Sequence, residues 1–297
     1  MATVEGDLTV GVIGLGAMGA PMAANLLRHG RSTVRISGRD RAKHNGLLES
    51  GAQWCATPRE LAEGADVALL MLPDLPEVEA VLAGPDGLLA AFAEDLIVII
   101  SSTSSPTGVR ELAARLSQQT DGAVRLVDAP VSGGVDGATA GTLSIMVGGA
   151  DADVTRVLPV LAGCGTPVHL GPLGAGQVAK ACNQMIVAAT ILALGEAAVL
   201  ADRSGLDLAT LFELLAGGYA GSRVLATRGG RIVTEDYSPS GVAKYMVKDL
   251  DFASAVAAET STHAVLLPTL RAAFVEMVSS DLGDFDIAVT RRFVAER

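Results

Sequence analysis

The chain has 297 residues, of which 49% are hydrophobic and only 3% aromatic, and its formal net charge is −11 at pH 7. This length suggests about two domains with an ample apolar core, and the acidic charge argues against nucleic acid or an anionic membrane as a partner. Cys55, Cys164 and Cys182 have no CxxC spacing and are typical of a reducing compartment. We therefore expect a soluble, cytoplasmic protein.

The first 37 residues have the pattern of a strand, a glycine-rich turn, a helix and a second strand. The apolar run Leu8–Ile13 precedes the turn, and helical spacing of apolar residues follows it up to His29. In this context a GxGxxG turn brings the backbone and a helix N-terminus close to a pyrophosphate. A plain glycine-rich turn is the alternative. The predicted cofactor-binding residues are Gly14, Leu15, Gly16, Ala17, Met18 and Gly19.

Strands continue to alternate with helices up to about residue 172. Strands are expected at 65–72, 96–100, 124–128, 142–147 and 167–170, with a helix at 109–116. Such alternation predicts a Rossmann-type α/β domain, a doubly wound and mostly parallel sheet, over residues 1–172. The loops after Leu72, Ile100 and Asp128 should then lie at the carboxyl edge of the sheet, where these sheets bind ligands.

Only helical patterns follow, so residues 173–297 are expected to form an all-helical substrate and oligomerisation domain, with helices at 177–204, 207–216, 222–227, 242–261 and 269–281. The first of these is entered through Gly174 and Gly176 and is almost wholly apolar. It carries Lys180, Asn183 and Gln184 on one face, since these lie at i, i+3 and i+4. Its length and interruption by Glu196 favour a core helix over a membrane span.

The end of the second strand bears on the choice of cofactor. An acid at this point usually binds the ribose 2′-hydroxyl of NAD, but here the strand ends at Ser37 and Arg39 follows. A hydroxyl and a guanidinium suit the 2′-phosphate of NADP. NADP(H) is therefore favoured and NAD(H) stays possible, because Asp40 is close enough to bind the ribose and the basic loop could simply be solvated.

Three motifs together resemble the β-hydroxyacid dehydrogenase family, which includes 3-hydroxyisobutyrate dehydrogenase and has a 6-phosphogluconate dehydrogenase-like plan. They are the Gly14–Gly19 turn, the stretch from Asp128-Ala-Pro-Val-Ser-Gly-Gly to Gly149, and Gly174-x-Gly-x-x-x-Lys180-x-x-Asn183. The resemblance covers essentially the whole chain. Within the family, the stretches around Lys180 and Gly217–Leu225 are most similar to tartronate semialdehyde reductase (2-hydroxy-3-oxopropionate reductase).

The resemblance implies an NAD(P)-dependent oxidoreductase that acts on a small carboxylated aldehyde or a 3-hydroxyacid. Lys180 would be the general acid and base, and Asn183 would orient the substrate oxygen. Ser132, Gly133 and Gly134 would bind the substrate carboxylate, in keeping with the affinity of hydroxyls and unobstructed N–H groups for an anion. Further substrate contacts are expected from Thr103 and Gln184, and further cofactor contacts from Ser37, Arg39, Leu72, Pro73, Thr103 and Lys248.

The resemblance also implies a homodimer or homotetramer. The four histidines have no metal-ligand spacing, and no metal is expected. An imine reductase is the second enzyme hypothesis, although that class usually lacks the lysine. A cofactor-bound scaffold or sensor is the third hypothesis.

The sequence departs from the family at one position that matters for the substrate. Eight residues before Asp249 the family commonly has an aromatic residue that forms a wall of the substrate pocket, whereas this chain has Gly241. Lys244 also lies in a stretch that is usually apolar or acidic. We therefore expect a substrate that is larger or more acidic than a three-carbon semialdehyde.

Overall fold

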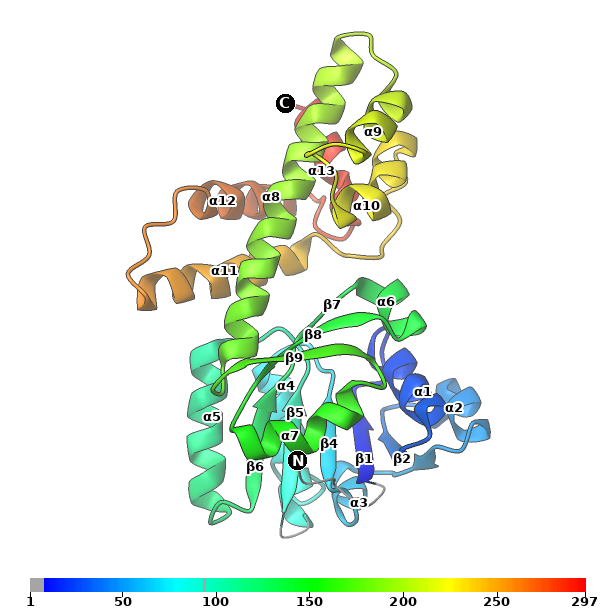
Figure 1. The fold of residues 1–297 in the computed structure, drawn as a ribbon, viewed down its shortest axis with the longest axis vertical. Helices are drawn as coiled ribbons and strands as arrows, with labels where there is room; N and C mark the ends of the chain where they lie inside the picture. The colour runs from blue at the N-terminus through cyan, green and yellow to red at the C-terminus, as the bar shows by residue number, and fades with distance from the viewer. Residues whose placement is uncertain (1–7, 93–94) are drawn as a thin grey trace. The chain divides into compact units, whose positions relative to one another are not determined.

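A computed structural model describes residues 8–92 and 95–297 (Figure 1). Contacts between Cα atoms divide the chain into two compact units, Met1–Lys180 (unit 1) and Ala181–Arg297 (unit 2). Each unit has its own hydrophobic core.

Unit 1 is built around a nine-stranded sheet with the order β3-β2-β1-β4-β5-β6-β8-β7, and β9 pairs with β8. The pairs from β3 to β6 are parallel, β8 pairs antiparallel with both β6 and β7, and β9 is parallel to β8. The strands are β1 (Leu8–Ile13), β2 (Ser32–Ser37), β3 (Gln53–Trp54), β4 (Val67–Leu70), β5 (Leu96–Ile100), β6 (Val124–Asp128), β7 (Val131–Ser132), β8 (Leu143–Gly148) and β9 (Gly165–Gly171). The predicted doubly wound, mostly parallel sheet is confirmed.

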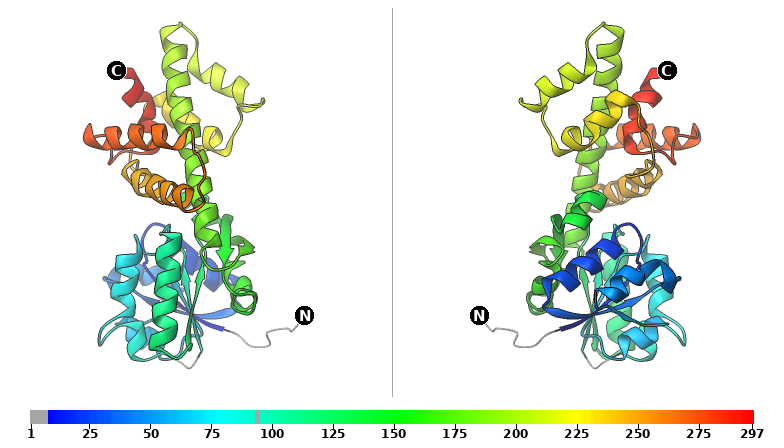
Figure 2. Two further views of the ribbon diagram at one scale, coloured as in Figure 1. Left: turned by 90° about the vertical axis from the view of Figure 1, so that its left-hand side faces the viewer. Right: turned by 90° about the vertical axis from the view of Figure 1, so that its right-hand side faces the viewer.

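Helices cover both faces of this sheet (Figure 2). They are α1 (Gly19–His29), α2 (Asn45–Glu49), α3 (Pro58–Ala62), α4 (Leu75–Leu82), α5 (Pro106–Gln119), α6 (Gly134–Ala140) and α7 (Asp151–Leu161), with short 3-10 turns at Arg41–His44 (η1) and Leu88–Ala90 (η2). In β5, Ile97 and Ile99 belong to one core cluster, whereas Val98 and Ile100 belong to the other. Every residue of β5 is therefore buried, which explains its unbroken apolar run.

Several elements extend beyond the sequence prediction for local reasons. α5 starts at Pro106 rather than at Val109, because Ser105 caps it by accepting a hydrogen bond from Gly108 N and proline suits the first helical position. The two-residue strands β3 and β7 were too short to produce a recognisable pattern. α10 (Arg223–Thr234) runs well past Thr227 although Gly229 and Gly230 lie within it, since Gly229 packs against Leu225 and Phe212.

Unit 2 is helical, in agreement with the prediction. It contains residues 181–203 of α8 (Ala175–Arg203), then α9 (Leu208–Ala216), α10, α11 (Lys244–Glu259), α12 (Leu267–Ser279), η3 (Ile287–Val289) and α13 (Thr290–Ala295). By length and composition alone α8 could cross a membrane. Its residues Ala188, Ile191 and Ala198, however, are fully buried in the core of unit 2, which agrees with the expected core helix.

Candidate functional site

The glycine-rich turn joins β1 to α1 at the carboxyl edge of the sheet. Gly14 has φ 95°, and a Cβ there would lie 2.2 Å from Met71 O. A Cβ on Gly19 would lie 2.0 Å from Gly14 O, whereas a Cβ on Gly16 would meet no atom within 4 Å. Gly14 and Gly19 are therefore required by the turn itself, while Gly16 leaves open space beside the start of α1. This arrangement fits a pyrophosphate that approaches the backbone at Gly16.

The end of β2 has polar residues where the sequence predicts the adenosine half of a dinucleotide. Ser37 is buried, and Gly38 faces Leu15, whose side chain lies 3.3 Å from the position of an added Cβ. Arg39 is exposed and pairs with no acid within residues 8–92 and 95–297. Asp40 caps η1 by accepting a hydrogen bond of 3.1 Å from Ala42 N, and it also pairs with Lys43.

Two further loops leave the same edge. Leu72 follows β4, and its side chain lies beside the glycine turn, 3.2 Å from where a Cβ on Gly14 would be. The next residue, Pro73, is exposed. After β5, the hydroxyls of Ser101, Ser102 and Ser104 are buried without a hydrogen-bond partner in the part of the chain that the structure describes. Buried hydroxyls are normally satisfied, so this loop retains unused hydrogen-bonding capacity beside the half-buried Thr103.

The third loop follows β6 and contains Ser132, Gly133 and Gly134. Ser132 ends β7, which pairs with β8 through Val131 and Ile145. Gly133 and Gly134 have φ angles of 135° and 64°, a backbone that side chains rarely adopt. Both glycines are exposed and Ser132 is half-buried. A hydroxyl followed by this glycine backbone can bind a carboxylate.

Lys180 lies at this third loop. Its side chain is only 8% exposed, and its Nζ donates a 2.8 Å hydrogen bond to the carbonyl oxygen of Val131. Val131 is the residue before Ser132, so the ammonium and the predicted carboxylate site lie side by side. A buried ammonium needs such a polar partner, since desolvating it alone is costly.

Two buried polar residues, absent from the sequence prediction, hold the start of α8. Asp128 at the end of β6 accepts 2.7 Å hydrogen bonds from Gly174 N and from Gln177 N. The Gln177 side chain accepts a hydrogen bond from Ser104 N (2.9 Å) and donates one to Ser102 O (2.8 Å). The start of α8 is thus bound to the loops after β5 and β6. Asp128 begins the Asp128–Gly149 motif, but its partners could not be identified from the sequence.

In unit 2 the polar residues of α8 form a chain of their own. Asn183 Nδ2 donates to Gln184 Oε1 (2.9 Å), and Gln184 Nε2 donates to Asp249 Oδ2 (2.6 Å). Asp249 is 5% exposed, and it too was absent from the predicted site. Lys248 is half-buried and lies over the Phe252 ring, 5.3 Å from its centroid.

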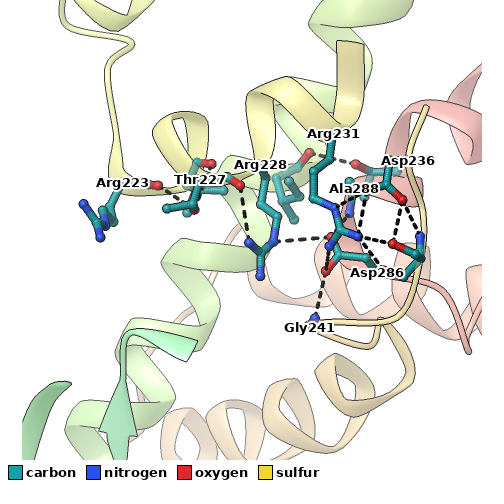
Figure 3. Close-up of polar contacts among 12 residues, drawn as sticks. Arg223, Thr227, Arg228, Arg231, Asp236, Gly241, Asp286 and Ala288 are labelled. Atoms are coloured by element: carbon teal, nitrogen blue, oxygen red, sulfur yellow. Dashed lines mark hydrogen bonds and ion pairs between the residues drawn. The ribbon is translucent and has the colours of Figure 1, made fainter. Parts of the chain in front are cut away.

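Gly241 belongs to a network of buried charges in unit 2 (Figure 3). Its N–H donates to the fully buried Asp286, at 2.8 Å, and Asp286 also pairs with Arg228 at 3.3 Å and Arg231 at 3.1 Å. An added Cβ on Gly241 would lie 3.4 Å from Arg228 Nη2. Lys244, in contrast, is exposed and pairs with Asp284 at 2.7 Å.

Unit 1 thus brings together the glycine turn, the serine loop, Ser132 and Lys180. Asn183, Gln184, Lys248 and Gly241 belong to unit 2. Within the described residues no group of three or more histidine, cysteine or acidic side chains could hold a metal ion.

Residues 9–174 match the family described as the NAD binding domain of 6-phosphogluconate dehydrogenase. Residues 174–293 match the family described as the NAD-binding domain of NADP-dependent 3-hydroxyisobutyrate dehydrogenase. Together the two families cover nearly all of the chain.

Individual proteins give the same result. The chain is 38% identical to 2-hydroxy-3-oxopropionate reductase of Escherichia coli, over 83% of each chain. It is 36% identical to the NAD-dependent L-serine dehydrogenase of Pseudomonas aeruginosa, over 84% of this chain and 85% of that one.

Solved structures extend the comparison. The Mycobacterium tuberculosis 3-hydroxyisobutyrate dehydrogenase with L-serine has a TM-score of 0.82 at 33% identity, and the alignment covers 97% of this chain and 99% of that chain. An imine reductase from Myxococcus stipitatus with NADP+ has a TM-score of 0.62 at 18% identity, over 96% and 99% of the two chains. This second likeness shows a shared fold only.

The glycine turn generates a prediction about dinucleotide binding. Gly16→Ala should leave the free energy of unfolding nearly unchanged, because the added methyl meets open space. It should weaken dinucleotide binding roughly tenfold or more, about 1.4 kcal/mol, because we expect the pyrophosphate to occupy that space. Gly19→Ala is the matched variant, and it should also lower the stability, since its Cβ clashes with Gly14 O. Fluorescence titration and urea unfolding measure the two quantities. Unchanged dinucleotide affinity in Gly16→Ala would contradict the assignment.

Proposed function

The chain belongs to the 3-hydroxyisobutyrate dehydrogenase family of NAD(P)-dependent hydroxyacid dehydrogenases, and we propose that it interconverts a small carboxylated aldehyde and the corresponding 3-hydroxyacid with NADP(H). The observation that carries the proposal is the position of Lys180. Its Nζ lies at the carbonyl of Val131, directly before the Ser132-Gly133-Gly134 loop. The proposed proton donor is thus adjacent to the proposed carboxylate site.

In the proposed reaction each group of the chain has one task. The substrate carboxylate binds to the Ser132 hydroxyl and the N–H groups of Gly133 and Gly134. Lys180 Nζ donates a proton to the carbonyl oxygen in reduction and takes it back from the hydroxyl in oxidation. Bound nicotinamide supplies or accepts the hydride. Asn183 and Gln184 orient the substrate, and Thr103 contacts both substrate and nicotinamide.

NADP(H) is the cofactor that the described residues favour. Arg39 is exposed and unpaired within the described chain, so its guanidinium is available for a 2′-phosphate. Asp40, the competing ribose ligand, is engaged by Ala42 N and Lys43. We assign Gly14 to Gly19, Ser37, Leu72, Pro73 and Lys248 to the same cofactor. An NAD-dependent relative shows that the fold also accommodates the other nucleotide.

The substrate is proposed to be larger or more acidic than a three-carbon semialdehyde. The backbone of residue 241 is not in the left-handed region, so its conformation does not require a glycine. Its lack of a side chain leaves Arg228 Nη2 uncovered by an aromatic ring, and this nitrogen makes no hydrogen bond within the described residues. Both cations pair with an acid, but Lys244 uses its single nitrogen to bind Asp284, whereas Arg228 binds Asp286 through Nε and keeps Nη2 for a second carboxylate.

The two other functions are less well supported. The family matches and Lys180 favour a hydroxyacid dehydrogenase over an imine reductase, whose likeness extends to the fold alone. A non-catalytic scaffold or sensor would have no use for a lysine beside a carboxylate loop. We further propose that the enzyme acts in the cytoplasm as a homodimer or homotetramer on a small carboxylated substrate, without a nucleic-acid or membrane partner.

Replacing Lys180 tests the proton donor. Lys180→Met should lower kcat by roughly 10²- to 10⁴-fold, the range for loss of a general acid, and should leave the Kd for NADPH within about twofold. Stopped-flow hydride transfer and nucleotide titration give the two values. Lys244→Met removes an exposed, paired ammonium and serves as the control, with kcat unchanged. Full activity of Lys180→Met would contradict the mechanism.

Replacing Arg39 tests the cofactor assignment. Arg39→Ala should raise the Kd for NADPH roughly tenfold, about 1.4 kcal/mol, because the 2′-phosphate loses its charge-assisted hydrogen bonds, and should leave the Kd for NADH unchanged. Both constants are measured by fluorescence titration. Equal affinities of the variant and the unmodified chain for NADPH would remove the assignment.

A panel of acid semialdehydes tests the substrate hypothesis. Four- and five-carbon semialdehydes with a second carboxylate should have a higher kcat/KM than tartronate semialdehyde. Gly241→Phe should change the ratio of the two kcat/KM values by roughly tenfold or more and reverse the order, as expected when a pocket loses space. Lys244→Met should preserve the order. Best turnover of the unmodified enzyme with tartronate semialdehyde would end the hypothesis.

A further inference from the structure

The start of α8 is held by a buried carboxylate, an unusual device for a helix N-terminus in this chain. The side chains that cap the other α-helices of the described residues are half-buried or exposed: Ser222 caps α10, and the Asp207 side chain accepts a 2.8 Å hydrogen bond from Thr210 N at the exposed start of α9. The buried Asp286 caps only the 3-10 turn η3, where two arginines pair with it. Asp128 is fully buried. Burying a carboxylate costs far more than exposing one, so a plain cap does not account for it.

The surroundings of Asp128 are shaped to accept it. An added Cβ on Gly148 would lie 2.4 Å from Asp128 Oδ1, and one on Gly176 would lie 2.8 Å from Oδ2 and 2.2 Å from Met146 O. Both glycines therefore make room for the carboxylate and for close contact between α8 and the sheet. Burial raises the pKa of Asp128 to about 6, and hydrogen bonds from the backbone of Gly174 and Gln177 oppose this rise. At pH 7 and above the group is thus mainly ionised and both oxygens accept hydrogen bonds.

Gln177 attaches the first turn of α8 to the sheet at a second place. Its backbone N–H binds Asp128, and its buried side chain binds the backbone of the serine loop at Ser104 N and Ser102 O. Both the oxygen and the nitrogen of the side-chain amide therefore form hydrogen bonds. The first turn of α8 is therefore fixed to the ends of two neighbouring strands, β5 and β6.

Lys180 lies three residues after Gln177, on the same side of the helix. Its Nζ reaches Val131 O at 2.8 Å, and Val131 lies three residues after Asp128. A shift or rotation of the first turn of α8 would move the ammonium relative to the Ser132 loop. A misplacement of about 1 Å can cost roughly 100-fold in rate.

We propose that Asp128 and Gln177 are positioning residues for Lys180: they fix the first turn of α8 to β5 and β6, so that the ammonium is held in register with the substrate carbonyl. This proposal rests on the proposed role of Lys180 as proton donor. Neither residue touches the reacting atoms. Their contribution is to kcat, through the geometry of the lysine.

The experiment compares Asp128→Asn with Lys180→Met and with Asp207→Asn. Asp128→Asn keeps the shape of the side chain but places an amide NH₂ against backbone N–H donors. We expect kcat to fall roughly 100-fold, with the substrate KM and the Kd for NADPH within about threefold. Asp207→Asn changes an exposed cap of the same chemistry in unit 2 and should leave kcat unchanged.

Gln177→Met provides a second measurement, and decides the matter if Asp128→Asn does not fold. It retains the backbone bond to Asp128 and the length of the side chain but loses both bonds to the serine loop. We expect at least a tenfold loss of kcat, again with little change in nucleotide affinity. Native circular dichroism and urea unfolding confirm that the variants are folded.

The outcomes separate the two proposals. If Lys180→Met is inactive while folded Asp128→Asn and Gln177→Met keep kcat within twofold, the positioning role is overturned and the proposed function stands. If Asp128→Asn only lowers the midpoint of urea unfolding and leaves kcat unchanged, the carboxylate is a structural cap and the positioning role is again overturned. If Lys180→Met is fully active, the proposed function itself fails.

Discussion

The first turn of α8 depends on the hydrogen bonds that a buried carboxylate accepts from its backbone. Asp128, at the carboxyl end of β6, accepts hydrogen bonds from the backbone N–H groups of Gly174, which directly precedes α8, and of Gln177 in its first turn. A helix N-terminus has unpaired donors and a partial positive charge, so a carboxylate suits it. Because this carboxylate is shielded from water, its hydrogen bonds are stronger than those of an exposed cap. The position of Lys180 follows from this contact.

The same edge of the sheet collects the other groups that a hydride-transfer enzyme needs. In a parallel sheet the carboxyl ends of successive strands meet at one edge. Here β1 supplies the glycine turn, β5 the serine loop, and β6 and β7 the Ser132 loop. The three glycines of the first turn have different tasks. Gly14 and Gly19 permit tight backbone contacts, and Gly16 leaves space for a ligand.

Much of this could be predicted from sequence because the signals are local. The unbroken apolar run of β5 and the apolar residues of β6 predicted the bounds of both strands correctly, and the GxGxxG turn lies where a strand is followed by a helix. Asp128 and Gln177 could not be assigned, since their roles depend on contacts across 46 and 73 residues of chain. The contact of Asp249 with Gln184 could not be predicted for the same reason, because the two residues lie 65 positions apart.

Charge was the hardest property to judge from sequence. Lys244 stood out as an added cation, yet its partner Asp284 is 40 residues distant and neutralises it at the surface. Arg228 was not predicted to be a site residue, although both Arg228 and Arg231 pair with the buried Asp286, which also binds the N–H of Gly241 (Figure 3). Only the folded structure determines which charges are paired and which of them can contact a substrate.

A crystal structure of the enzyme with NADP+ and a bound 3-hydroxyacid would test the central claim most directly. The account predicts that the substrate hydroxyl lies within hydrogen-bonding distance of Lys180 Nζ. It also predicts that the substrate carboxylate binds to Ser132, Gly133 and Gly134, and that Asp128 retains its hydrogen bonds to Gly174 and Gln177. A substrate hydroxyl bound away from Lys180 Nζ, with the Lys180 hydrogen bond to Val131 O unchanged, would contradict it.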